Sequence, residues 1–442
     1  MIQRVRGFQD LDGVAAAAAS YIENLAARVA RLYNFGEIRL PIVERVELYQ
    51  RSTGETSDIV EKQMYVFPEG EQSEQLIALR PEGTPGVVRA YLEAGLDRSN
   101  PEQRFFYSGP MFRRERPQKG RYRQFHQFGV EVFGRSDAVC DAELLVMIDD
   151  IAQFLNLDVT MEVNSLGCAE CRPAYRAALV EWGRAHLNEL CEDCHNRIDR
   201  NPLRLLDCKI DVALTKQAPG SLDFLCDACR AHFAMVQRLL KATSIEFVIN
   251  PRLVRGLDYY TRTAFEVLSG DVGSQSAVIA GGRYDGLVEA LGGARVPGIG
   301  FAIGIERLVL AYERTLAAPS SARLHDKAHD PDAVGAVAGT KDANGSRRVD
   351  AVVASLGDAA IERAFVVAHE LRVPGGKAVE LASPERKLKA ALARANKIGA
   401  RYAVIIGDTE LTRGVVQLKD LKAGTQREVA TADLIDEMGA TT

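Results

Sequence analysis

The 442-residue sequence predicts an α+β protein of about three domains, each with its own residue pattern. A strand–turn–strand pattern over residues 103–133 indicates a long antiparallel hairpin. Helical stretches and seven cysteines distinguish residues 167–245, which we interpret as an inserted, mainly helical module. After residue 347, strands alternate with helices, a pattern typical of a small α/β domain.

The composition restricts the class of protein. Hydrophobic residues make up 47% of the chain and charged residues 26%, as in ordinary globular proteins. Lys and Arg total 55 against 60 Asp and Glu, a net charge of −5, so a polyanion must be bound by a local basic patch. We expect no secretory signal, no membrane segment and a cytoplasmic location.

The first half of the chain predicts a helix followed by strands. Apolar residues at helical spacing predict a helix over residues 15–33. Strand-like alternation follows over 37–44, where Pro41 indicates an edge or a bulge. The hairpin strands, 105–112 and 125–133, enclose a basic loop, and the module contains helices around 174–190 and 228–241.

The second half predicts a return to the core and then a separate domain. Residues 248–268 are strand-like, and residues 297–313 indicate a Gly-rich strand that enters a helix near Ile305. An Ala-, Asp-, Gly- and Ser-rich stretch predicts a linker. The expected domains are a core in two parts, 1–166 and 246–316, an insertion at 167–245, a linker at 317–346 and a C-terminal domain at 347–442.

The most informative segment is 109–134, GPMFRRERPQKGRYRQFHQFGVEVFG, which interleaves arginines with aromatic residues. Guanidinium groups suit phosphate oxygens, and flat rings suit a stacked base. The segment therefore predicts a nucleotide-binding site within an acidic chain.

Two further clusters follow in order: RGLDYYT at 255–261 and GIGFAIGIER at 298–307. Each alone has an ordinary structural interpretation, as core or as close backbone packing. Together, the three clusters resemble motifs 2 and 3 of the class II aminoacyl-tRNA synthetases, and LVRGLDYYT at 253–261 resembles the histidyl-tRNA synthetase family. Residues 39–65 resemble the dimer-forming motif 1 region, and LRPEGT at 79–84 and GGRYDGL at 281–287 are also similar.

The resemblance implies a class II antiparallel-sheet catalytic core with a helical insertion and a C-terminal α/β anticodon-binding domain. It implies a histidine–tRNA ligase that joins L-histidine to ATP, with Mg²⁺, to give histidyl-adenylate and pyrophosphate. Histidine is then transferred to the 3′ end of tRNA(His). The family also implies a homodimer.

Adenylation is an in-line attack on the α-phosphate, which requires positive charge and accurate positioning. The resemblance places Arg113 and Arg255 at the α-phosphate and Arg307 at the distal phosphates, as catalytic residues. It implies that Phe125 stacks on adenine. The implied ATP-binding residues are Arg113, Glu115, Arg121, Phe125 and Arg307.

The resemblance also implies a histidine pocket. Its residues are Glu82, Gly83, Thr84, Gln127, Glu131, Tyr259 and Tyr260. Glu82, Thr84 and Gln127 match residues around the ammonium, Glu131 and Tyr260 match residues that reach the imidazole, and Tyr259 lines the pocket. Glycines around Gly282 are expected to let the backbone approach the substrate. His126 matches no catalytic position, and we expect it to be structural.

The cysteines leave two alternatives open. The insertion contains three CxxC pairs: Cys168/Cys171, Cys191/Cys194 and Cys226/Cys229. A single cysteine, Cys208, lies between the last two pairs. Two such pairs can form a tetrahedral structural zinc site, and the alternative is a set of reduced, buried thiols. The spacing does not select which pairs would close.

The C-terminal domain has a basic helical region that would suit a tRNA backbone, and a solvated helix face is the alternative. Its residues are Lys387, Lys389, Arg394, Lys397 and Arg401.

Two other functions compete with the ligase. One is a non-catalytic, histidine-sensing paralogue, the regulatory subunit of ATP phosphoribosyltransferase. Such paralogues lack the anticodon-type domain and lose ATP-site residues. This chain has the domain and retains those residues. The other is a nucleic-acid-binding module without catalysis, which leaves Arg255 and Tyr260 unexplained. The ligase is therefore the favoured hypothesis.

Overall fold

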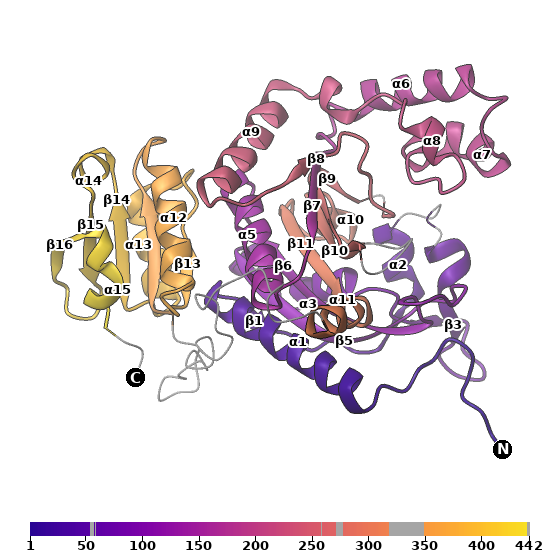
Figure 1. Cartoon of the computed structure of the whole chain (residues 1–442), viewed down its shortest axis with the longest axis horizontal. Coiled ribbons are helices and arrows are strands. Elements are labelled where there is room, and N and C mark those ends of the chain that lie inside the picture. The colour runs from indigo at the N-terminus through magenta and orange to yellow at the C-terminus, as the bar shows by residue number, and fades with distance from the viewer. Residues whose placement is uncertain (54–56, 58, 258, 271–276, 318–348, 440–442) are drawn as a thin grey trace.

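The computed structural model describes residues 1–53, 57, 59–257, 259–270, 277–317 and 349–439. These residues form sheets of eight, five and three strands with the helices that cover them (Figure 1). The expected linker lies outside the described residues from position 318 onward. None of the described helices combines the length and the apolar character that crossing a membrane requires.

The eight-stranded sheet forms the centre of the protein. Its strands are antiparallel except at the two edges, where β1 pairs with β5 and β7 with β8 in parallel. In spatial order they are β1 (Gly36–Glu37), β5 (Gln103–Phe112), β6 (Gln124–Phe133), β11 (Gly298–Gly304), β10 (Ala277–Arg283), β9 (Thr261–Leu268), β7 (Thr160–Ser165) and β8 (Val248–Ile249). The predicted hairpin is confirmed as β5 and β6, and β6 pairs directly with the distant β11.

Four helices cover one face of this sheet. They are α1 (Gly13–Leu32), α5 (Ala138–Phe154), α9 (Asp227–Ala242) and α11 (Ile305–Ala317). Phe128, Val130 and Val132 of β6 are buried in their shared core. Because side chains alternate along a strand, Gln127 and Glu131 face the opposite side. The predicted N-terminal helix and the strand-to-helix transition at Ile305 are confirmed.

A three-stranded sheet lies beside the core. Its order is β2 (Val43–Arg45), β4 (Leu76–Leu79) and β3 (Tyr65–Pro68). Nearby helical segments are α2 (Val46–Thr53), η1 (Ile59–Gln63), α3 (Thr84–Glu93), α4 (Leu96–Ser99) and α10 (Leu287–Ala290). The strand-like pattern over 37–44 is divided between two sheets around Pro41, because proline lacks the N–H that a ladder requires.

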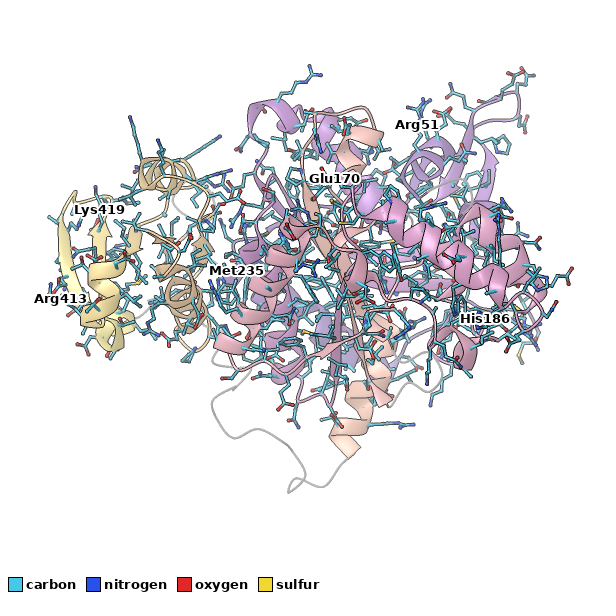
Figure 2. All side chains as sticks on the ribbon, turned by 90° about the horizontal axis from the view of Figure 1, so that it is seen from above. Arg51, Glu170, His186, Met235, Arg413 and Lys419 are labelled. Carbon is cyan, nitrogen blue, oxygen red and sulfur yellow. The ribbon has the colours of Figure 1, made fainter. Side chains whose placement is uncertain are left out.

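The insertion runs between β7 and β8. Before α9 it contains α6 (Arg172–Ala185), α7 (Glu192–Arg200), η2 (Pro202–Leu205), α8 (Val212–Thr215) and η3 (Ser221–Phe224). The helix expected over 174–190 ends earlier, at Ala185, since His186 leaves the helical conformation at φ −108°. Seen from above in Figure 2, His186 of the insertion lies towards the opposite end of the molecule from Arg413 and Lys419 of the C-terminal domain.

The predicted C-terminal strand–helix alternation is confirmed. The strand order is β13 (Val379–Leu381), β12 (Ala351–Ser355), β14 (Tyr402–Ile406), β15 (Val415–Asp420) and β16 (Gln426–Ala430), with only the first three parallel. The helices are α12 (Ala360–Arg372), α13 (Leu388–Lys397), α14 (Asp408–Arg413), η8 (Thr431–Asp433) and α15 (Leu434–Glu437).

The basic region of this domain is smaller than the sequence predicts. Arg394 of α13 pairs with Glu380 at 2.8 Å, and Lys397 Nζ donates to the Asn100 side chain at 2.9 Å. Including Arg394 in a solvated basic face is therefore wrong, because a buried carboxylate holds its guanidinium. The exposed members are Lys387, Lys389, Lys397 and Arg401.

Helix α5 connects the core to the insertion through Asp141, whose carboxylate is fully buried. Asp141 forms a close ion pair with Arg283 of β10 and accepts a hydrogen bond from the Thr263 hydroxyl at 2.6 Å. His232 Nε2, on α9, lies 2.7 Å from the same carboxylate. One anion thus joins α5, the sheet and the last insertion helix.

Two residues further on, Glu143 connects α5 to the C-terminal domain. Its buried carboxylate is bracketed by Arg104 of β5 at 2.7 Å and Arg372 of α12 at 2.5 Å. Next to it, the Arg135 guanidinium donates to the Leu381 carbonyl at 2.8 Å. The C-terminal domain is therefore fixed to the core by the buried Arg372–Glu143 ion pair and by a buried hydrogen bond from Arg135.

We expect Arg372→Ala to lower the free energy of unfolding by about 3 kcal/mol, because the buried Glu143 carboxylate loses one of its two ion-pair partners and keeps only Arg104. Urea denaturation followed by circular dichroism measures this loss. Arg413→Ala is the control: it removes an exposed ion pair with Glu428 and should cost less than about 1 kcal/mol. Equal losses in the two variants would contradict the assigned role of Glu143.

Candidate active site

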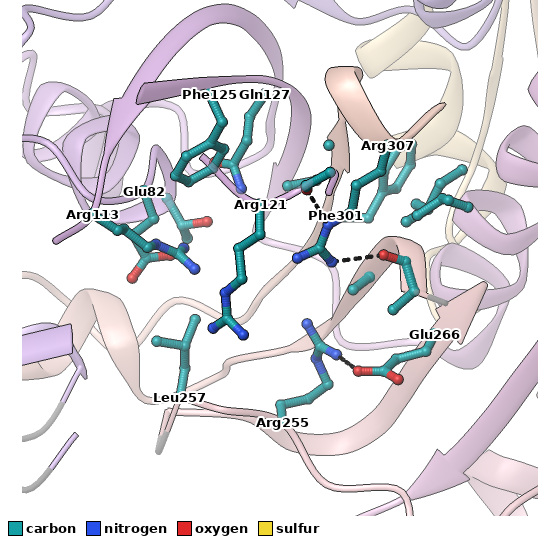
Figure 3. Close-up of a pocket in the computed structure, with 18 of the residues that line it drawn as sticks. Glu82, Arg113, Arg121, Phe125, Gln127, Arg255, Leu257, Glu266, Phe301 and Arg307 are labelled. Atoms are coloured by element: carbon teal, nitrogen blue, oxygen red, sulfur yellow. Dashed lines mark hydrogen bonds and ion pairs between the residues drawn. The ribbon is translucent and has the colours of Figure 1, made fainter. Parts of the chain in front are cut away.

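A pocket of about 390 Å³ opens on the sheet face opposite the four helices (Figure 3). Most of the residues proposed from the sequence line it together, although they come from four separate parts of the chain. They are Glu82, Thr84, Arg113, Glu115, Arg121, Phe125, Gln127, Arg255, Tyr260 and Arg307.

The β5–β6 hairpin supplies one wall. Arg113, just after β5, donates from Nε to the Pro81 carbonyl at 2.8 Å, and its guanidinium lies 5.2 Å from the centre of the Phe125 ring. In the connecting loop, Arg121 forms a close ion pair with Glu115. The hairpin thus presents two cations and an aromatic face to one cavity.

Arg255 and Arg307 come from two other parts of the chain and line the same cavity. Arg307, at the start of α11, donates to the Gly120 carbonyl at 3.0 Å and to the Ala277 carbonyl at 2.9 Å. Arg255, in the segment before β9, forms a close ion pair with Glu266 of that strand. Both pairings are visible as dashed lines in Figure 3. Backbone carbonyls and a carboxylate therefore fix both guanidinium groups.

The pocket brings several arginines close together, and their charges act on one another. Burial, followed by the charges of Arg121 and Arg113, lowers the pKa of Arg307 to about 10. Burial is the larger cause of this shift, and repulsion from the neighbouring cations adds to it. A ligand with several negative charges, such as a polyphosphate, would relieve it.

The other end of the pocket is built around Glu82, a buried carboxyl group. Burial raises the pKa of Glu82 to about 7, although the nearby Arg113 charge opposes this. Its Oε2 accepts a hydrogen bond from the Tyr259 hydroxyl at 2.9 Å. Within the part of the chain that the structure describes, its buried Oε1 has no hydrogen-bond partner. This oxygen is suited to a cationic ligand group.

Three of the sequence-proposed residues lie behind the lining. Glu131 accepts a hydrogen bond from the Thr84 hydroxyl at 2.6 Å and a close one from Tyr284, and burial raises its pKa to about 8. Tyr259 supports Glu82 from the same layer. Gly83 leaves space for a ring, since a Cβ there would lie 2.3 Å from Cε2 of Tyr107.

Gly282 is also constrained, but by the sheet. Its φ is +156°, and a Cβ would lie 2.7 Å from the Thr263 carbonyl oxygen. At Gly282 the close approach is therefore between the backbones of neighbouring strands, since Gly282 pairs with Ala264 on one side and with Gly300 on the other.

His126 is held by Glu306, whose carboxylate lies 2.9 Å from both its backbone N and its Nδ1. This is the structural role that we expected for the histidine. Glu306 lines the pocket at the start of α11, beside Arg307.

Several lining residues were missed by sequence reasoning. They are Tyr107, Asp207, Lys209, Glu266, Tyr284 and Glu306. Tyr284 and Glu306 lie inside segments that the resemblance already covered, so their position there was a usable signal. Asp207 and Lys209 come from the insertion, and no local pattern predicts that this segment reaches the pocket.

Comparison with known proteins agrees with this arrangement. The histidyl-tRNA synthetase family model matches residues 7–308, and the anticodon-binding domain model matches residues 350–441. A histidine–tRNA ligase of Syntrophotalea carbinolica is 44% identical over 97% of this chain and 96% of its own length. One from Aquifex aeolicus is 45% identical over 98% of this chain and 100% of its own.

Solved structures give the same result for the fold. The apo histidyl-tRNA synthetase of S. aureus has a TM-score of 0.58 at 32% identity, with 100% of both chains covered. A second solved structure, from Bacillus halodurans C, is described as an ATP phosphoribosyltransferase regulatory subunit/histidyl-tRNA synthetase. It has a TM-score of 0.53 at 18% identity and covers 92% of this chain and 98% of its own. At this identity the likeness shows the fold alone. From its matched models and full-length relatives, the chain belongs to the histidyl-tRNA synthetase family.

Proposed function

We propose that this pocket is the adenylation site of a histidine–tRNA ligase. The observation that carries the proposal is the gathering, in one cavity, of the Arg121, Arg255 and Arg307 guanidinium groups and the partly unsatisfied Glu82 carboxyl, with Arg113 beside that carboxyl. ATP, entering as its Mg²⁺ complex, would occupy the cationic end. The histidine ammonium would occupy the acidic end.

In this proposal the guanidinium groups perform the chemistry by position and charge. The histidine carboxylate attacks the α-phosphate in line, and pyrophosphate leaves. Arg113 and Arg255 stabilise the negative charge that develops on the α-phosphate oxygens, and Arg307 binds the departing phosphates. Their fixed contacts to carbonyls and to Glu266 mean that little reorganisation is needed during the reaction.

Histidine selection would depend on the acidic end. Glu82 binds the ammonium with Thr84 and Gln127, which line the same cavity. Tyr260 reaches the imidazole, and Glu131 supports this end from behind Thr84. An apolar amino acid would leave these buried polar groups unpaired, which is the basis for strong rejection.

The second step would transfer histidine to the 3′ end of tRNA(His). The basic loop between β5 and β6 stands at the pocket entrance, with Gly120, Arg121 and Tyr122 among its lining residues. In the C-terminal domain, the exposed Lys387, Lys389 and Arg401 would contact the tRNA backbone. We also infer that the enzyme acts in the cytoplasm, and that the cysteines of its insertion offer ligands for structural zinc.

We infer that a second copy of the chain covers the three-stranded sheet. Cross-strand register places Val43, Leu79 and Tyr65 in one row and Arg45, Ile77 and Phe67 in the next, on the face opposite the buried Ala78, so that five of these six residues are apolar or aromatic. Val43 and Phe67 are 40% and 39% exposed. An apolar sheet face of this kind is a typical surface for a homodimer.

A histidine sensor without catalysis is the second candidate, and the site argues against it. A sensor needs only the acidic end of the pocket, whereas this chain also retains Arg113, Arg121, Arg255 and Arg307. The matched anticodon-binding domain has no use in such a sensor.

We expect the protein to catalyse histidine-dependent ATP–pyrophosphate exchange, and Arg255→Ala to reduce the exchange rate at least about 100-fold, as the loss of a charge-stabilising donor does elsewhere. Radiolabelled pyrophosphate incorporation measures the rate. Arg184→Ala, at a guanidinium that is 65% exposed on the insertion, is the control and should retain full activity. Histidine binding without any exchange would identify a sensor, and exchange with another amino acid would refute the pocket assignment.

We expect histidine binding to weaken as the pH falls below about 7, because the raised pKa of Glu82 means that its carboxyl is neutral there and loses its attraction for the ammonium. The KM for histidine should rise by up to about tenfold per pH unit. Exchange kinetics between pH 6 and 8 measure this.

Glu82→Gln is the comparison, since its side chain does not titrate. Its KM should be high and should depend on pH only through protonation of free histidine, which is common to both proteins. Parallel pH profiles for the two proteins would show that Glu82 does not bind the ammonium.

We expect Phe67→Asp to convert the dimer to a monomer, because the charge would be buried against the partner's apolar face. Sedimentation velocity measures the change. Leu187→Asp places the same charge at another apolar residue, 42% exposed on the insertion, and should leave the dimer intact. A dimeric Phe67→Asp protein would locate the interface elsewhere.

A further inference from the structure

The fold gathers the cysteines of the insertion into two separate groups. The first is Cys168, Cys171, Cys226 and Cys229, and the second is Cys191, Cys194, Cys208 and Asp211. In each group, one ligand atom from every residue lies within 4.8 Å of the others. The three CxxC pairs therefore do not share one site: the outer two meet, and the middle pair is completed by Cys208 and a carboxylate.

The distances within each group are those of a four-coordinate ion. Cys168 Sγ lies 3.7 Å from Cys171 Sγ and 3.9 Å from Cys226 Sγ. Tetrahedral zinc, with Zn–S bonds of about 2.3 Å, places its sulfur ligands about 3.8 Å apart. A disulfide would bring two sulfurs to about 2 Å. The first group thus has the spacing of thiolates around a single ion.

The second group has the same geometry with one oxygen ligand. Cys191 Sγ lies 3.7 Å from Cys208 Sγ, and Cys208 Sγ lies 3.5 Å from Asp211 Oδ2. A zinc–oxygen bond is slightly shorter than a zinc–sulfur bond, so the sulfur–oxygen separation is expected to be about 3.6 Å. Asp211 has no place in the CxxC pattern and is identified only by the fold.

Backbone N–H groups support the ligand atoms in both groups. The Cys226 N–H donates to Cys171 Sγ at 3.1 Å, and the Asp211 N–H donates to Cys208 Sγ at 3.5 Å. The Cys191 N–H donates to the Asp211 carboxylate at 3.0 Å. Such contacts orient metal ligands and stabilise thiolate charge.

We propose that the insertion binds two zinc ions, one in each group, and that the second ion fixes the segment that delivers Lys209 to the active-site pocket. Zinc is the ion because three or four thiolates in a small tetrahedral site match its ligand preference. The insertion has small hydrophobic clusters of its own, and two of them are built largely from the same cysteines. Domains of this kind are commonly stabilised by a metal ion.

The first ion closes the base of the insertion, where the chain leaves the core and returns to it. Cys168 and Cys171 follow β7, whereas Cys226 and Cys229 begin α9. Beside them, the Arg262 N–H donates to the Gly167 carbonyl at 2.8 Å, and Arg172 makes a close contact with the Tyr260 carbonyl. This ion therefore lies against the segment that carries the histidine-pocket tyrosine.

The second ion fixes residues 207–211. Asp207 and Lys209, on either side of Cys208, line the pocket together with Arg121 and Arg307. Arg204 holds Asp207 at 3.0 Å from the preceding turn. Lys209 is thereby supplied by the insertion as a further cation at the phosphate end, a role that depends on the proposed use of ATP.

Metal analysis by inductively coupled plasma mass spectrometry tests the two sites on the full-length protein, purified without chelator. We expect two zinc ions per chain, falling to one in Cys168→Ser and to one in Cys208→Ser. Cys140→Ala, at the cysteine outside the insertion, should retain two. Zinc release from the unmodified protein on titration with a mercurial gives the same count if a variant fails to fold. One zinc, no zinc, or iron in its place would overturn the proposal.

Exchange kinetics test the delivery of Lys209. We expect Lys209→Ala to raise the KM for ATP about tenfold, by loss of a charged contact, while both zinc ions stay bound. Asp211→Ala should lose one zinc and raise the same KM to a similar extent. An unchanged KM in Lys209→Ala would overturn the delivery role. A wild-type protein that binds two zinc ions but shows no exchange would refute only the ligase function.

Discussion

Side chains along β6 point alternately to the sheet face that the helices cover and to the face that carries the pocket. Phe128, Val130 and Val132 have no exposure and belong to the main core. On the other face, Gln127 lines the pocket and Glu131 supports it. A shift of one residue in the pairing of β6 with β5 and β11 would bury the polar set and expose the apolar one, so the register is strongly specified.

This register also determines which distant residues meet. Because β6 pairs with β11, the hairpin that carries Arg113 and Phe125 lies beside the strand that leads into Arg307. Because β11 continues through β10 to β9, Glu266 reaches Arg255 on the same face. The arrangement of the pocket residues is thus a consequence of strand order. Helix α5 holds the insertion and the C-terminal domain to that sheet through Asp141 and Glu143.

Local patterns were sufficient to predict the elements and much of the pocket. The hairpin, the helix beginning at Ile305 and the C-terminal alternation each have a strong periodic signal, and the structure has all three. Family motifs identified ten of the lining residues. Sequence patterns did not predict features that depend on contacts between distant parts of the chain. The pairing of Arg394 with Glu380 removes a cation from the basic face. Nothing near Lys209 in the sequence indicates that its side chain reaches the pocket.

The central claim is that one continuous pocket binds ATP at its guanidinium end and histidine at its carboxyl end. Inhibition by a non-hydrolysable sulfamoyl analogue of histidyl-adenylate tests this most directly, because the analogue spans both ends. The account predicts inhibition competitive with both ATP and histidine, with one analogue bound per chain. Competition with only one of the two substrates would show that they bind in separate sites.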